Sequence, residues 1–111
     1  MAGKVVYINS ETVGKGDERL GGILMANFLR TLGDSAEKPV AIFLINGGVK
    51  LAAEGSPVLD HLAHLEETGV EVLSCRTCVE WFDLEQKIEV GRISSMAAFV
   101  QLAMGNQVIS P

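Results

Sequence analysis

Short apolar runs alternate with longer amphipathic segments along the chain, and this alternation predicts strands separated by helices. Continuous apolar runs over residues 4–9, 40–45 and from Val70 onward are typical of strands inside a parallel sheet. Two weaker runs, at residues 91–94 and 107–110, complete five predicted strands. The pattern therefore predicts an α/β fold, a three-layer α/β/α arrangement around a five-stranded and mostly parallel sheet.

Helices are predicted between these strands from apolar stripes and capping residues. Asp17 and Ser56 are suitable caps, Pro57 suits a first helical position, and Gly33 is expected to end the first helix. The predicted helices cover residues 17–32, 49–53, 57–68, a short segment after the cysteines, and residues 95–104.

Composition indicates one globular domain, residues 1–111. Hydrophobic residues make up 48% of the 111 residues and charged residues 21%, which excludes a disordered chain. No run approaches the roughly 20 apolar residues of a transmembrane helix. Residues 1–4 lead directly into the first predicted strand without the apolar core of a signal peptide, so we expect a cytoplasmic protein. A net charge of −5 without a basic cluster argues against nucleic acid and anionic membrane partners.

The predicted helix over residues 95–104 has no charged side chain. In a chain of this length, its apolar surface exceeds what one small core needs. We therefore expect this helix to pack against another subunit in a homo-oligomer.

The two cysteines, Cys75 and Cys78, lie where a predicted strand passes into a helix. Backbone N–H groups, the helix dipole and Arg76 all favour a thiolate at this junction, so we expect a lowered pKa for the Cys75 thiol. This spacing in a cytosolic chain indicates redox, metal or nucleophilic chemistry. Free cysteines are often buried packing residues instead. The polar neighbours Ser74, Arg76 and Thr77 favour chemistry at Cys75, whereas both interpretations stay open for Cys78.

Open parallel sheets carry their sites beyond the carboxyl ends of the strands, where four predicted loops meet. Backbone N–H groups of residues 46–48 are able to face an anion, but two glycines are a weak signal and a simple tight turn is the favoured interpretation. The candidate pocket residues in these loops, besides the cysteines, are Asn9, Asn46, Gly47, Gly48, Arg76, Thr77, Ser95 and Met96.

Neither a metal site nor a cofactor is predicted. A zinc site would need His61 and His64 in addition to the cysteines, and both histidines fall on the polar side of their predicted helix, away from the thiols. The sequence also lacks a glycine-rich phosphate-binding motif after its first strand, so we expect no nucleotide cofactor.

Five segments, residues 16–21, 46–52, 54–59, 69–78 and 90–96, match one family in the right order. In these segments the chain resembles the DsrE-type (DsrE/F-like) sulfur-relay family, and most closely the C-terminal domain of YedF-like proteins linked to sulfur and selenium metabolism. The resemblance implies a five-stranded parallel sheet between helices and assembly into dimers, trimers or hexamers.

The resemblance also implies a sulfur-relay (sulfurtransferase-like) function. A cysteine takes sulfane sulfur from a donor protein as a persulfide and passes it to the thiol of an acceptor protein. Cys75 matches the family's active cysteine, and Cys78 matches the second cysteine of its C-x-x-C form. Arg76 stands where the closest relatives usually have glycine. The carrier domain that precedes the YedF-like domain is absent, so we expect either a stand-alone version or an excised domain.

Two other functions stay open. The pair of Cys75 and Cys78 suits a thiol–disulfide redox or sensor protein, although the aromatic and proline neighbours of the thioredoxin motif are missing. The chain would also suit a non-catalytic subunit of an oligomer, in which the cysteines serve only for packing.

Overall fold

The computed structural model describes residues 3–111, so the lead-in predicted at residues 1 and 2 lies outside the described residues. Strands and helices alternate from the start of this range to its end, as the sequence pattern predicts. The elements are β1 (Lys4–Ile8), α1 (Glu18–Asp34), β2 (Ala41–Leu44), the 3₁₀ helix η1 (Asn46–Ala52), α2 (Leu59–Glu67), β3 (Glu71–Cys75), α3 (Arg76–Trp81), β4 (Arg92–Ser94), α4 (Met96–Gly105) and β5 (Gln107–Ile109).

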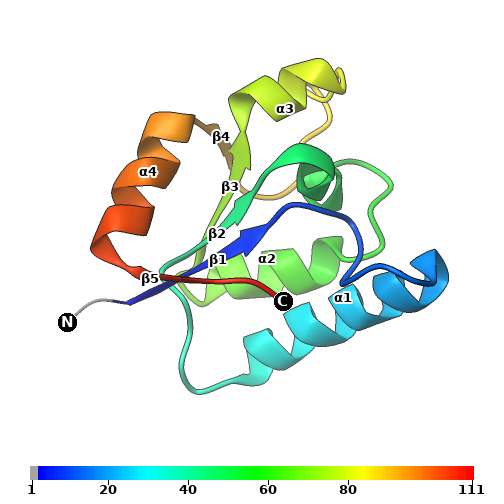
Figure 1. The fold of residues 1–111 in the computed structure, drawn as a ribbon, viewed down its shortest axis with the longest axis horizontal. Coiled ribbons are helices and arrows are strands. Elements are labelled where there is room, and N and C mark those ends of the chain that lie inside the picture. Colours follow the sequence, from blue (N-terminus) through cyan, green and yellow to red (C-terminus); the bar gives the residue numbers. More distant parts are fainter. Residues whose placement is uncertain (1–2) are drawn as a thin grey trace.

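The strands form one five-stranded sheet in the order β4-β3-β2-β1-β5, and every neighbouring pair is parallel. Helices α1 and α2 cover one face of the sheet, and α4 lies on the other (Figure 1). The predicted three-layer α/β/α architecture is therefore confirmed. Helix α3 continues from the carboxyl end of β3 and projects beyond the sheet edge (Figure 1).

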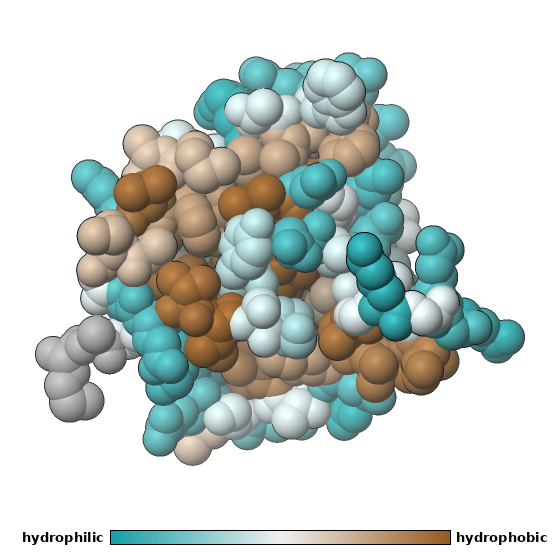
Figure 2. Space-filling model, viewed as in Figure 1, coloured by the Kyte–Doolittle hydropathy of each residue, from teal (hydrophilic) through white to brown (hydrophobic). Residues whose placement is uncertain are grey.

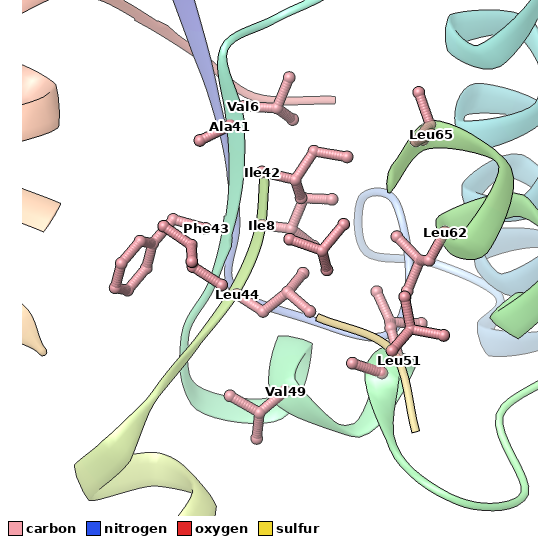
Figure 3. Packing of buried hydrophobic residues seen from close by; sticks show 14 of the residues in the cluster. Val6, Ile8, Ala41, Ile42, Phe43, Leu44, Val49, Leu51, Leu62 and Leu65 are labelled. Atoms are coloured by element: carbon pink, nitrogen blue, oxygen red, sulfur yellow. The ribbon is translucent and has the colours of Figure 1, made fainter. Parts of the chain in front are cut away.

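The core is densest between the sheet and α2. Along β2, Ile42 and Leu44 point toward Leu62 and Leu65 of α2, all four of them fully buried (Figure 3). Alternate residues of a strand point to opposite faces, so Phe43 points the other way. Full burial of such side chains stabilises the fold by about 1.5–3 kcal/mol each.

The opposite face of the sheet has a smaller aromatic cluster beneath α4. The Phe99 ring lies with its centroid 4.9 Å from that of Phe43 and 5.5 Å from that of Tyr7. These contacts hold α4 on the sheet, although no residue of this helix is fully buried.

The predicted start of α1 is confirmed, but its predicted end is wrong. An Asp17 carboxylate oxygen accepts a hydrogen bond from the Leu20 N–H at 2.8 Å, as expected of an N-cap. Gly33 does not terminate the helix, which continues to Asp34. Gly33 is buried, and a Cβ on it would lie 2.9 Å from Cδ2 of His64. This glycine permits close packing of α1 on α2.

The predicted start of α2 is also wrong. The helix begins at Leu59, two residues after Pro57. The Ser56 hydroxyl accepts a hydrogen bond from the Val58 N–H at 3.2 Å, so it caps the turn that precedes α2. Within residues 3–111, every helix is too short or too polar to span a membrane.

Candidate functional site

The strand order brings the predicted loops to one edge of the sheet. Cys75 ends β3 and pairs with Ser94 on the neighbouring strand β4. Asn46 follows β2 on the other side of β3, and Asn9 follows β1, one strand further. Strands lie about 4.8 Å apart, which puts the end of β1 roughly 10 Å from that of β3. The loops after β2 and β4 therefore flank the end of the strand that carries Cys75, and the loop after β1 lies farther away.

Cys75 occupies the junction between β3 and α3, and its side chain is only 2% exposed. It shares a sheet face with Leu73, which pairs with Phe43, so the thiol lies on the α4 side. Ser74 points to the opposite face, is fully buried, and has no hydrogen-bond partner for its hydroxyl among residues 3–111. Cys75 is thus buried although Arg76 and Thr77, which follow it on α3, are exposed, and its role in chemistry stays a prediction.

Cys78 lies in the first turn of α3 and is half-buried. Its sulfur accepts a hydrogen bond from the backbone N–H of Asn46 at 3.1 Å. Burial raises the pKa of the Cys78 thiol, the Asn46 N–H acts in the opposite direction, and the neighbouring Cys75 thiol raises the pKa further. Both cysteines are free thiols. The site thus contains two adjacent thiols that differ in exposure and in hydrogen-bond partners.

The turn after β2 is shaped so that it can donate this hydrogen bond. Asn46 has a φ of 54°, a left-handed conformation that asparagine tolerates better than most residues. Two residues on, a Cβ at Gly48 would lie 2.3 Å from the carbonyl oxygen of Ile8, so only glycine lets η1 approach the end of β1 so closely. This turn therefore directs the Asn46 N–H at the sulfur of Cys78.

The other predicted pocket residues have different surroundings. Arg76 and Thr77 are exposed on the first turn of α3. Gly47 lies over the loop after β1, where a Cβ on it would be 3.9 Å from the Cα of Ser10. The structure thus brings Gly47 and the loop after β1 together, and it leaves Arg76 and Thr77 exposed between the two cysteines in the sequence.

Ser95 and Met96 belong to the start of α4. The Ser95 hydroxyl accepts a hydrogen bond from the Ala98 N–H at 3.1 Å, so its observed contact is that of a helix cap. Met96 is 51% exposed. Asn9 is exposed at the end of β1.

Sequence reasoning missed two contacts around α3. One is the hydrogen bond from Asn46 to Cys78, whose only sequence signal is an asparagine before two glycines at a strand end. The other is the Lys50 ammonium, which lies 4.4 Å from the centroid of the Phe82 ring. Lys50 therefore holds η1 against Phe82 at the carboxyl end of α3. Both residues also line a cavity of about 370 Å³ beside the loop at residues 53–57.

Solved structures share this fold at low sequence identity. The YchN protein from E. coli superimposes with a TM-score of 0.72 at 18% identity, and a protein of unknown function from Methanobacterium thermoautotrophicum with 0.71 at 17%; both matches cover 100% of each chain. A conserved protein of unknown function from Bacteroides thetaiotaomicron gives 0.65 at 17% identity, covering 97% of this chain and 94% of that one. No curated protein matches the sequence significantly. The model of the DsrE/DsrF-like family matches residues 3–111, nearly the whole chain, and the protein therefore belongs to the DsrE/DsrF-like family.

Proposed function

We propose that this protein is a sulfur-relay protein that carries sulfane sulfur as a persulfide on Cys75 and passes it to a partner thiol. The observation that carries the proposal is the pair of adjacent free thiols at the carboxyl edge of the sheet, one of them bonded to a backbone N–H. Membership in a family that is associated with sulfur relay supports it.

The proposed chemistry needs only cysteine thiols and a persulfide that supplies the sulfur. A Cys75 thiolate attacks the outer sulfur of a persulfide, a new S–S bond forms, and the thiol that carried this sulfur leaves as a thiolate. Another thiolate later attacks the outer sulfur and releases Cys75 as a thiolate, and the sulfur then passes on to the acceptor protein. The 2% exposure of Cys75 favours a carrier, because a buried persulfide is sheltered from other thiols.

A loading assay with a washing step tests this proposal. The protein is incubated with a cysteine desulfurase and cysteine, desalted in the presence of a low concentration of thiol, and its intact mass is measured. We expect wild type to retain one sulfur and Cys75→Ser to retain none, with the same circular dichroism spectrum. Retention of sulfur by Cys75→Ser would refute Cys75 as the carrier. A selenium-containing donor in the same assay distinguishes a sulfur cargo from a selenium cargo.

A second candidate function is thiol–disulfide cycling, and the proximity of the Cys75 and Cys78 thiols favours it. Equilibration in glutathione buffers of defined potential tests it. Redox cycling predicts a disulfide midpoint near the potential of the cytosol. A thiol pair that stays reduced across these buffers excludes it.

We also propose that the protein is a homo-oligomer that acts in the cytoplasm with donor and acceptor proteins. Apolar side chains gather on the outside of α4, where Met96, Val100 and Met104 are 51%, 50% and 84% exposed (Figure 2). Light scattering is expected to show an oligomer that Val100→Glu weakens and Lys15→Glu, in an exposed loop, does not. A monomeric wild type at all concentrations would contradict this proposal.

A further inference from the structure

The two thiols of the site differ in how a partner can reach them. Cys75 is 2% exposed and lies on the α4 side of the sheet, whereas Cys78 is half-buried in the first turn of α3. Sulfur transfer between proteins requires an attacking thiolate to approach the S–S bond directly, so the sulfur under attack must be accessible. In this conformation Cys78 meets that requirement better than Cys75.

The sulfur of Cys78 also accepts a hydrogen bond, from the backbone N–H of Asn46. The Asn46 N–H lies 3.1 Å from this sulfur and stabilises negative charge there. The left-handed backbone of Asn46 sets the direction of this N–H group. This hydrogen bond therefore offsets part of the cost of burying a thiolate at Cys78, both when the thiolate attacks a donor and when it departs as a leaving group.

Resting on the proposed function, we propose that Cys78 is the exchange thiol of the site, through which sulfane sulfur enters and leaves, and that Cys75 is the sheltered store. The Asn46 N–H acts as a positioning group for the sulfur of Cys78. Cys75 immediately precedes α3 and Cys78 lies in the first turn of this helix, so the internal transfer takes place within one short segment.

Each step balances without an added oxidant or reductant. The Cys78 thiolate attacks the outer sulfur of the donor persulfide, the donor S–S bond breaks, and the donor leaves as a thiolate that takes up a proton. The Cys75 thiolate then attacks the outer sulfur on Cys78, forms its own persulfide, and releases Cys78 as a thiolate. Burial raises the pKa of Cys78, so its proton must first leave to solvent and exchange accelerates with rising pH.

Rapid-quench loading with glutathione persulfide tests the order of these steps. Unreacted thiols and persulfides are alkylated, and trypsin separates the cysteines because Arg76 lies between them. Wild type is expected to carry sulfur first on Cys78 and then on Cys75. Cys78→Ser is expected to load Cys75 at least about tenfold more slowly, since the more accessible thiol and its hydrogen bond from Asn46 are missing. Cys75→Ser is expected to load Cys78 transiently and to lose the sulfur on washing with thiol.

Loading of Cys75 at the wild-type rate in Cys78→Ser would overturn the inference and leave the proposed function intact. If neither cysteine of wild type took up sulfur, the proposed function itself would be refuted.

A second pair of variants tests Asn46 without altering a cysteine. Valine is strained in the left-handed conformation and glycine is not, so Asn46→Val should displace the N–H that Asn46→Gly retains. We expect Asn46→Val to slow loading of Cys78 more than Asn46→Gly does, and to shift the pH profile of Cys78 alkylation upward. Identical pH profiles for the two variants would overturn the positioning role.

Discussion

Gly91 precedes β4, and its replacement tests how closely β4 must approach β3, the strand that ends at Cys75. Its φ is +77°, and a Cβ at this position would lie 2.1 Å from the carbonyl oxygen of Val72 on β3. Gly91→Ala therefore strains the backbone and also forces β4 away from β3. The left-handed conformation alone costs an alanine about 1–2 kcal/mol. Because the clash is with backbone, we expect a total loss of more than about 3 kcal/mol in the free energy of unfolding.

Two other glycines separate these contributions. Gly69 has a φ of +101° and Gly22 lies in α1, and neither would bring a Cβ within 4 Å of another group. Gly69→Ala is expected to lose only the conformational part, about 1–2 kcal/mol. Gly22→Ala is expected to gain about 0.5–1 kcal/mol, since alanine favours a helix.

Urea denaturation measures all three variants, with the midpoint reporting stability and the slope reporting two-state behaviour. Displacement of β4 in Gly91→Ala also removes the strand beside Cys75, so iodoacetamide should alkylate Cys75 faster than in Gly69→Ala. If Gly91→Ala were as stable as Gly69→Ala, the reasoning from the Cβ clash would be refuted.

Three further perturbations follow from single contacts. Asp17→Ala removes the cap of α1 and should lower the free energy of unfolding by about 1 kcal/mol in urea denaturation, while an unchanged midpoint would argue against the cap. Leu62→Ala leaves a cavity at a fully buried position and should cost about 2–5 kcal/mol by the same measurement; a loss below 1 kcal/mol would contradict tight packing of α2. Cys75→Ala removes a neighbouring thiol that raises the pKa of Cys78, so that pKa should fall. At a fixed pH below it, the thiolate fraction and the alkylation rate of Cys78 should then rise. An unchanged pH profile would show that the two thiols do not interact.

The fold follows from patterns that lie within single segments. The apolar run at residues 40–45 predicts β2 because a strand buried on both faces needs apolar side chains on both. Asp17 predicts the start of α1 because a cap bonds within its own turn. Such local signals are sufficient for element order and for the parallel sheet.

The errors arise where a residue's role depends on a distant partner. Gly33 has the local signal of a helix end, but it serves close packing against His64, 31 residues away. Cys75 is buried because of the residues that pack on its face of the sheet. The hydrogen bond to Cys78 forms because η1 and α3 lie next to each other in the fold. The candidate cysteines could be predicted from the sequence, whereas the division of exposure between them required the structure.

The central claim is that Cys75 stores sulfane sulfur, and one measurement tests it most directly. Wild-type protein is loaded with inorganic polysulfide, desalted, alkylated and digested with trypsin, and the two cysteine peptides are analysed by mass. We predict one added sulfur in the peptide that ends at Arg76 and contains Cys75. Two intact thiols without added sulfur, or a disulfide between Cys75 and Cys78, would contradict the claim.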